Sequence, residues 1–131
     1  MVTKFGGCVV YVEDVLGTVS FYERAFGLER KFVSEKNLYA EMKGLAAFGF
    51  AERTFAAGNV PTELLRSDRS TLPVAAEIVI VAVDVDRAYA RAVEAGAVAV
   101  SSPVDKPWKQ RVAYVRDPNG FLVEICSEWS A

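Results

Sequence analysis

Residues 111–125 read Arg-Val-Ala-Tyr-Val-Arg-Asp-Pro-Asn-Gly-Phe-Leu-Val-Glu-Ile and describe a complete β-hairpin. Two runs rich in β-branched and aromatic residues, 111–115 and 121–126, flank the segment from Asp117 to Gly120. Aspartate, proline and glycine stand there at positions that a type I turn favours. The stretch therefore predicts two antiparallel strands, with Glu124 on the second.

The region before this hairpin predicts a strand, a helix and a further strand. Residues 77–83 form a β-rich run, Asp84 is a helix cap, and Gly96 ends the apolar spacing of a helix. A short strand is expected at 97–101. Residues 75–128 therefore predict a module in the order β-α-β-β-β.

The first half of the chain repeats this arrangement. Asp14 matches Asp84 at an offset of about 70 residues, and Gly27 ends the first helix. The predicted strands of this half lie at 6–12, 31–34, 38–42 and 45–50. Together these features predict one α+β domain with modules at 6–50 and 75–128. Residues 51–74 form a linker with one short helical turn at 62–65.

Composition restricts the classes of partner. The chain has 131 residues, 52% of them hydrophobic, with 15 Lys and Arg against 17 Asp and Glu. No basic stripe is available for nucleic acid, and no apolar run is long enough for a membrane span. Because no signal-peptide pattern is present at the start, we expect a cytoplasmic protein.

The chain contains no histidine, so catalysis by Ser-His or Cys-His pairs and metal sites with histidine ligands are excluded within one chain. Two cysteines, Cys8 and Cys126, lie in apolar, strand-like runs. We expect both to be reduced core residues. Chemistry in this protein must use carboxylates, phenols, amines, guanidinium groups, thiols or the backbone.

The capped helices, Phe21-Tyr22, Gly27-Leu28 and the hairpin at 111–125 resemble those of the vicinal oxygen chelate superfamily. That superfamily includes glyoxalase I, bleomycin-resistance proteins, extradiol dioxygenases and fosfomycin-resistance enzymes. The resemblance covers residues 6–129. It implies two βαβββ modules whose sheets form an incomplete barrel around a cavity, often completed by a second chain.

In metal-dependent members of this superfamily, four ligands come from the start of each module's first strand and from each module's last strand. The resemblance places Glu77 and Glu124 at two of these positions, and Gly7 stands at the start of the first module, five residues before Val12. Our alignment of the turn glycines, Gly44 with Gly120, places Phe48 at the fourth position. A shift of one residue restores no missing ligand. We therefore expect no metal or other cofactor; the alternative is a hard divalent ion held by Glu77 and Glu124.

Aromatic residues are candidates for contact with a flat ligand. Phe48 stands at a lost ligand position, and Trp108 lies in the loop before the penultimate strand, so together they predict a stacking pocket. Ordinary core packing is the alternative for Phe48. Tyr39 and Tyr114 are aligned with each other, and their hydroxyls either orient a ligand or reach water.

The two glutamates are the other ligand-binding candidates. Glu77 and Glu124 interrupt apolar strands on the expected cavity side, where an unpaired carboxylate takes up a proton or finds a cationic partner. In the structural alternative, one or both glutamates pair with Arg111 or Lys109, or Glu77 merely caps the end of its strand in solvent.

Two functions remain open from the sequence. The first is a metal-free small-molecule binding protein, similar to the bleomycin-resistance branch, that sequesters a drug-like or aromatic metabolite and so supports antibiotic resistance. The second is a lyase, isomerase or epimerase of the glyoxalase type, in which Glu77 and Glu124 hold an ion or act as general acid and base. We expect a homodimer. The long linker permits the modules to pair within one chain or between two.

Overall fold

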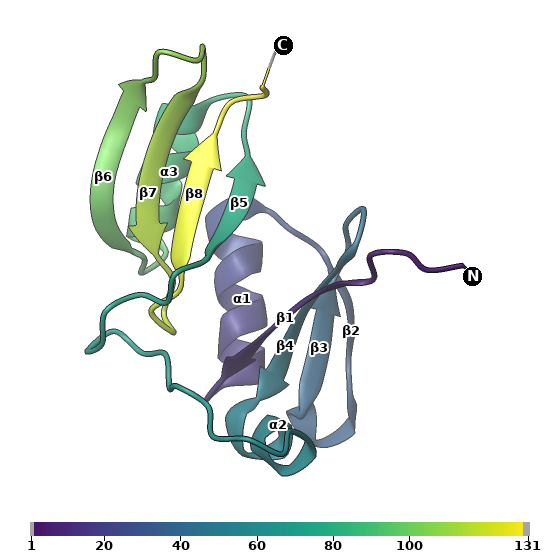
Figure 1. The fold of residues 1–131 in the computed structure, drawn as a ribbon. Helices are drawn as coiled ribbons and strands as arrows, with labels where there is room; N and C mark the ends of the chain where they lie inside the picture. The colour runs from purple at the N-terminus through teal and green to yellow at the C-terminus, as the bar shows by residue number, and fades with distance from the viewer. Residues whose placement is uncertain (1, 130–131) are drawn as a thin grey trace. The chain divides into compact units, whose positions relative to one another are not determined.

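The computed structural model describes residues 2–129 and shows an α+β fold with two mixed four-stranded sheets (Figure 1). The chain divides into two compact units. The first comprises residues up to Glu23 with Gly27–Arg66, and the second comprises Arg24–Phe26 with residues from Ser67 onward. The elements are β1 (Gly7–Val12), α1 (Val15–Phe26), β2 (Arg30–Val33), a 3₁₀ helix (Glu35–Asn37), β3 (Tyr39–Met42), β4 (Ala47–Glu52), α2 (Arg53–Asn59), β5 (Glu77–Val81), α3 (Val85–Glu94), β6 (Val98–Asp105), β7 (Arg111–Arg116) and β8 (Leu122–Cys126).

Both sheets have the same topology, which confirms the two predicted βαβββ modules. The strand orders are β1-β4-β3-β2 and β5-β8-β7-β6. In each sheet the first strand pairs in parallel with the last, and the other pairs are antiparallel. A parallel pair needs a crossover connection, which includes α1 in one module and α3 in the other. Within residues 2–129, no helix combines the length and apolar character needed to cross a membrane.

The predicted helix ends are confirmed by their capping contacts. The side chain of Asp14 accepts a hydrogen bond from the Gly17 backbone N–H at 2.9 Å, and Asp84 accepts one from Arg87 at 3.0 Å. Each aspartate satisfies a backbone donor that the first helical turn leaves unpaired. Gly27 ends α1 in the left-handed region, with φ 68°. These local signals explain why both helices begin where the sequence predicts.

The core of the first unit lies on one face of its sheet. Tyr22 of α1 stacks on Phe50 with ring centroids 5.3 Å apart and meets Phe48 edge-on at 5.2 Å. Because side chains alternate along a strand, Gly49 points to the opposite face. We call that opposite face, which carries Gly49 and its cross-strand neighbour Glu41, the open face of the first unit.

The second unit is organised in the same way. Helix α3 packs on β6, β7 and β8 (Figure 1), and Val115, Val123 and Ile125 are fully buried. Tyr114 and Glu124 alternate with these residues, so their side chains point to the other side of the sheet. We call that side the open face of the second unit.

The linker contains a helix that the sequence analysis missed. Helix α2 begins after Glu52, whose side chain accepts hydrogen bonds from the backbone N–H groups of Thr54, at 2.7 and 2.9 Å, and Phe55, at 3.2 Å. Glutamate is not among the common capping residues, and seven residues are too few for a clear apolar period. The helical turn predicted at 62–65 is absent, because those residues have no helical structure.

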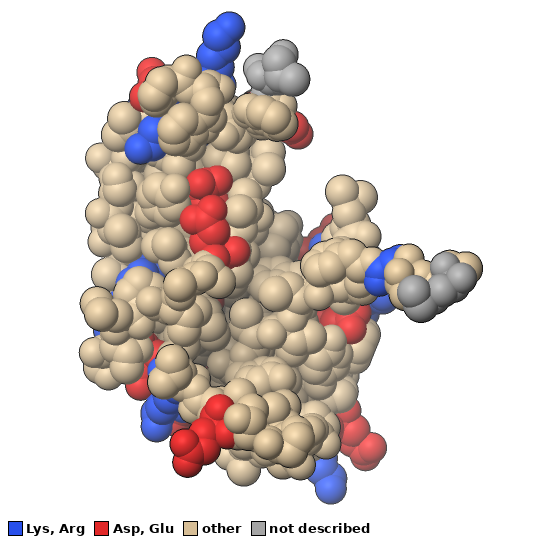
Figure 2. All heavy atoms as spheres, viewed as in Figure 1, with Lys and Arg blue, Asp and Glu red and all other residues tan. Residues whose placement is uncertain are grey.

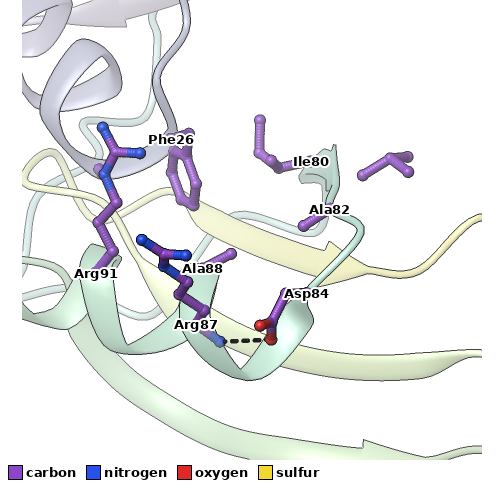
Figure 3. A pocket seen from close by; sticks show the side chains of 9 residues that line it. Phe26, Ile80, Ala82, Asp84, Arg87, Ala88 and Arg91 are labelled. Atoms are coloured by element: carbon purple, nitrogen blue, oxygen red, sulfur yellow. Dashed lines mark hydrogen bonds between the residues drawn. The ribbon is translucent and has the colours of Figure 1, made fainter.

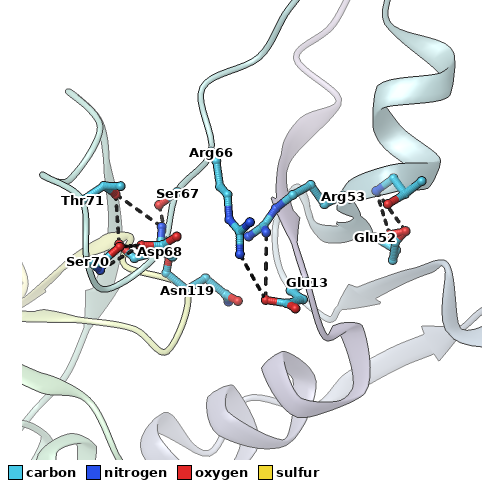
Figure 4. Close-up of polar contacts among 10 residues, drawn as sticks. Glu13, Glu52, Arg53, Arg66, Ser67, Asp68, Ser70, Thr71 and Asn119 are labelled. Atoms are coloured by element: carbon cyan, nitrogen blue, oxygen red, sulfur yellow. Dashed lines mark hydrogen bonds and ion pairs between the residues drawn. The ribbon is translucent and has the colours of Figure 1, made fainter.

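Polar contacts fix each part of the linker to its own unit (Figure 4). In the first unit, Glu13 forms ion pairs with Arg53 at 3.9 Å and Arg66 at 3.6 Å. In the second unit, the Ser67 hydroxyl donates to the Asn119 carbonyl at 3.0 Å. These contacts are formed on either side of the unit boundary, which falls between residues 66 and 67.

Candidate functional site

The structure brings Glu77 and Glu124 together on the open face of the second unit. In the parallel register of β5 and β8, Glu77 pairs with Leu122 and Val79 pairs with Glu124. Paired residues of neighbouring strands point to the same face, so both carboxylates lie on one side of the sheet. Their side chains lie close enough for Glu124 to raise the pKa of Glu77. In Figure 2, acidic side chains gather over β8 within a largely uncharged surface.

The phenol of Tyr114 lies beside these two carboxylates. Tyr114 of β7 pairs directly with Glu124, and its hydroxyl donates to Glu124 Oε1 at 2.9 Å. Arg111, which the sequence analysis considered as a partner for Glu124, binds Asp86 at 2.7 and 2.9 Å and Asp105 at 3.0 Å. The ion-pair alternative with Arg111 is therefore wrong, because that guanidinium is already bound to two other carboxylates.

The neighbouring groups change the proton affinities in this cluster. Glu77 is an exposed residue by its surface area, so its desolvation is partial. This desolvation, followed by the charge of Glu124 and a hydrogen bond to it, raises the pKa of Glu77. Burial and the hydrogen bond to Glu124 raise the pKa of Tyr114 to about 12 and that of the Cys126 thiol to about 11. Tyr114 and Cys126 therefore stay protonated near neutral pH, and Glu124 serves as their acceptor.

We expect Glu77→Gln to stabilise the protein above acidic pH. Because the pKa of Glu77 is higher in the folded state, its contribution to stability is fully present below its unfolded value of 4.5. That contribution is lost as the pH rises through the higher folded pKa. Glutamine has nearly the same shape as glutamic acid and cannot ionise. The melting temperature of the Glu77→Gln variant should therefore match that of the wild type near pH 4 and exceed it near pH 8.

Thermal unfolding across this pH range tests the Glu77 prediction. Glu63→Gln, at an exposed linker position, is the matched control and should follow the wild-type curve. Parallel curves for Glu77→Gln and the wild type at every pH would contradict the assignment of a raised pKa.

Sheet register identifies Gly49 as the counterpart of Glu124. Strand β1 pairs Val9 with Gly49, as β5 pairs Val79 with Glu124. Our alignment of the turn glycines placed Phe48 at this position and is therefore wrong by one residue. Phe48 points to the opposite face, where it packs on α1.

The counterpart of Glu77 is Gly7, as the sequence alignment predicts, since each residue begins the first strand of its module. Gly7 has φ 152° and approaches the neighbouring strand so closely that a Cβ atom there would lie 2.2 Å from the Ala47 carbonyl oxygen. A side chain at Gly7 would clash with backbone. A metal ligand at this position is therefore incompatible with the strand geometry.

The position of Gly49 is filled by a neighbouring side chain. A Cβ atom on Gly49 would lie 2.5 Å from the Tyr39 hydroxyl oxygen. The four positions implied by the resemblance thus hold two adjacent glutamates and two glycines, of which Gly7 faces backbone and Gly49 faces the Tyr39 side chain. These residues do not fit a four-ligand metal centre. Among residues 2–129, no three Asp, Glu or Cys side chains form a group suited to a metal ion.

Tyr39 and Glu41 form a second phenol–carboxylate pair, on the open face of the first unit. The Tyr39 hydroxyl donates to Glu41 Oε2 at 2.6 Å, and burial together with this bond raises the pKa of Tyr39 to about 12. The alignment of Tyr39 with Tyr114 is wrong, because Glu41 pairs with Gly49 as Tyr114 pairs with Glu124. Glu41 is not among the predicted site residues, although its period-two spacing from Tyr39 places both side chains on one face of the sheet.

The two aromatic candidates have different environments. Phe48 is half-buried and packs against Tyr22 and Phe50 in the first unit. Trp108 lies between β6 and β7 and is 52% exposed. Its Nε1 donates to Gln110 Oε1 at 2.8 Å, and Lys106 Nζ lies 6.0 Å from its ring centroid. Their roles in ligand binding remain predictions, and Trp108 is the more accessible of the two.

The two cysteines differ in exposure. Cys126 is buried, as expected, but Cys8 is exposed, so the expectation of a core position for Cys8 is wrong. Cys8 belongs to β1, the edge strand of its sheet, where fewer neighbours cover a side chain. Both thiols are free.

A pocket of about 390 Å³ lies in the second unit (Figure 3). Apolar residues such as Phe26, Ile80 and Ala88 line it together with the polar side chains of Arg87 and Arg91. None of the four residues predicted to contact a ligand lines this pocket. The predicted site and the pocket are therefore separate features of the unit.

Comparison with known proteins identifies the family. Residues 4–125 match the Glyoxalase/Bleomycin resistance protein/Dioxygenase superfamily, and the chain belongs to it. A search of curated proteins found no match.

Solved structures share the fold at low sequence identity. A glyoxalase-related enzyme from Fulvimarina pelagi has 17% identity and a TM-score of 0.81, with 97% of this chain and 89% of that chain covered. A glyoxalase/bleomycin resistance protein/dioxygenase from Nocardioides has 20% identity and a TM-score of 0.73, with 100% and 87% covered. A superfamily member from Sphaerobacter thermophilus has 18% identity and a TM-score of 0.69, with 97% and 98% covered.

Proposed function

We propose that this chain is a small-molecule binding protein of its superfamily that works without a complete metal centre. The observation that carries the proposal is the presence of Gly7 and Gly49 at the counterparts of Glu77 and Glu124. A side chain at Gly7 would meet the Ala47 backbone, and a side chain at Gly49 would meet the Tyr39 hydroxyl, so two of the four ligands are missing and their positions are occupied by neighbouring atoms. Direct contacts with side chains must then recognise the ligand.

The chemistry of the second unit's open face supports an amphipathic ligand. Glu77, Glu124 and Tyr114 provide polar groups, while Val79 and Val81 on the same face of β5 are 50% and 54% exposed. Sites for small molecules combine apolar surface with a few polar groups that fix orientation. A drug-like or aromatic metabolite has this character, and sequestration of such a drug would provide resistance to it.

A second candidate function is acid–base catalysis by the same cluster. The raised pKa of Glu77 favours it, because a carboxyl that keeps its proton to higher pH can serve as a general acid, and Glu124 lies beside it as a hydrogen-bond acceptor. In that case the protein is a lyase, isomerase or epimerase acting on an acidic C–H or O–H bond. Turnover that is lost in both Glu77→Gln and Glu124→Gln would favour this function over binding alone.

We expect no stoichiometric binding of Mn²⁺, Ni²⁺, Zn²⁺ or Mg²⁺ to the chelator-treated protein. Calorimetric titration of each ion, together with elemental analysis of protein purified without chelators, measures this. One equivalent of tightly bound metal would contradict the proposal. Loss of that binding in Glu124→Gln, but not in the exposed control Glu63→Gln, would then locate the ion at the glutamates.

A screen of aromatic drugs and metabolites by thermal shift follows the titration. A ligand that binds the native state raises the melting temperature, and the stabilisation grows with the logarithm of the ligand concentration once that concentration exceeds the dissociation constant. Glu124→Gln should weaken a hit that lies on the second open face, while Glu63→Gln should not. Equal binding by both variants would remove Glu124 from the site.

A further inference from the structure

We infer that Tyr39, held by Glu41, occupies the position from which a metal ligand would project at Gly49. The inference rests on the proposed function, because it names the groups that replace the missing ligand in the first unit. A Cβ atom on Gly49 would lie 2.5 Å from the Tyr39 hydroxyl oxygen and 3.0 and 3.1 Å from two ring carbons. The phenol therefore fills the space next to Gly49, and no longer side chain fits there without moving Tyr39.

Several contacts hold Tyr39 in this place. Its hydroxyl donates to Glu41 at 2.6 Å, and Lys31 Nζ lies 3.8 Å from the other carboxylate oxygen of Glu41. The ring of Phe32 lies 5.8 Å from that of Tyr39. An aromatic ring that covers a glycine on a neighbouring strand also compensates for the packing that glycine lacks.

The two open faces thus use the same polar chemistry in different ways. In the second unit, Tyr114 donates to Glu124, which stands at the ligand position itself. In the first unit, that position is Gly49, and the Tyr39–Glu41 pair covers it from the adjacent strand. A molecule on the first open face therefore contacts a phenol and a carboxylate in place of a metal ion.

A double-mutant cycle tests whether Tyr39 fills this position. Gly49→Ala in the wild-type background should lower the melting temperature by roughly 5 °C or more, as overpacking does in a protein of this size. In the Tyr39→Ala background, Gly49→Ala should change the melting temperature little, because the hydroxyl and ring atoms of Tyr39 that it would meet are absent. Tyr39→Phe should give an intermediate result, since the ring carbons remain.

Gly58→Ala is the matched control glycine, because nothing lies within 4 Å of a Cβ atom there. Because Gly58 lies in α2 and alanine is the better helix former, this substitution should raise the melting temperature, and by the same amount in both backgrounds. An equal cost of Gly49→Ala with and without Tyr39 would overturn the inference.

Titration of the wild type with Mn²⁺, Ni²⁺ and Zn²⁺ separates this inference from the proposed function. If the effect of Gly49→Ala depends on Tyr39, the two residues are coupled. Such coupling, together with the absence of metal binding, supports both this inference and the proposed function. Coupling together with one equivalent of bound metal overturns the metal-free function and retains the placement of Tyr39. The absence of coupling overturns the inference about Tyr39, whatever the titration shows.

Discussion

Replacing Phe50 by alanine is expected to lower the free energy of unfolding by about 3–5 kcal/mol. Phe50 is completely buried, and its ring lies 5.3 Å from that of Tyr22 and 4.8 Å from that of Phe48. The substitution removes both ring contacts and leaves a cavity that a packed core cannot fully close. Urea unfolding followed by circular dichroism measures the loss.

Phe55→Ala is the control for the Phe50 prediction. Phe55 lies on α2 and is 44% exposed, so its truncation should cost less than about 1 kcal/mol. Similar losses in the free energy of unfolding for Phe50→Ala and Phe55→Ala would show that Phe50 contributes no more to stability than an exposed phenylalanine. Because Phe50 and Gly49 are neighbours on β4, this anchor also fixes which face of the strand carries Gly49.

Replacing Asp117 by alanine is expected to lower the free energy of unfolding by about 3–5 kcal/mol. The Asp117 carboxylate is fully buried and accepts hydrogen bonds from the backbone N–H groups of Asn119 and Phe121, both at 2.9 Å. Alanine leaves two donors without this acceptor at the turn between β7 and β8. Urea unfolding measures the effect on stability.

Two variants bracket the Asp117 prediction. Asp117→Asn retains an acceptor oxygen and should cost less than alanine, while Asp105→Ala, at an exposed aspartate, should cost less than about 1 kcal/mol. A loss for Asp117→Ala no larger than for Asp105→Ala would contradict the role of the turn. Because this turn sets the register of β8, it also decides that Glu124 faces Tyr114.

The fold was predictable because its signals are local. Asp14 and Asp84 cap helices through contacts three residues away, and the Asp117–Gly120 turn closes the hairpin between adjacent strands. Each signal specifies its own element without knowledge of distant parts of the chain. The repeated order of elements then fixed the two βαβββ modules and their superfamily.

The candidate site was predictable only in part, because its geometry depends on pairing between distant strands. Gly120 precedes Glu124 by four residues, whereas Gly44 precedes Gly49 by five, so the turn glycines are not equivalent. The alignment based on them therefore selected Phe48. Only the parallel register of the first and last strands of each module shows that Gly49 is the counterpart of Glu124.

The contacts of Tyr39 with Glu41 and Gly49 could not be predicted from the sequence for a similar reason. They depend on where a ring projects across a pair of strands, and strand periodicity specifies a face without specifying a contact. Glu77 and Glu124 were found because carboxylates stand out in apolar runs. Tyr39, an aromatic residue in a strand, had no comparable signal, since aromatic residues are common in strands.

The strand order also constrains the order of events while the chain is being synthesised. The last strands of the two modules, β4 and β8, lie in the interior of their sheets, between the first strand and the third. Neither sheet is continuous until its final strand has been made. The first sheet becomes complete once residue 52 has left the ribosome, while the second must wait for residue 126. Until β8 has been made, β5 has no partner within its own sheet, and both of its edges present unpaired backbone groups.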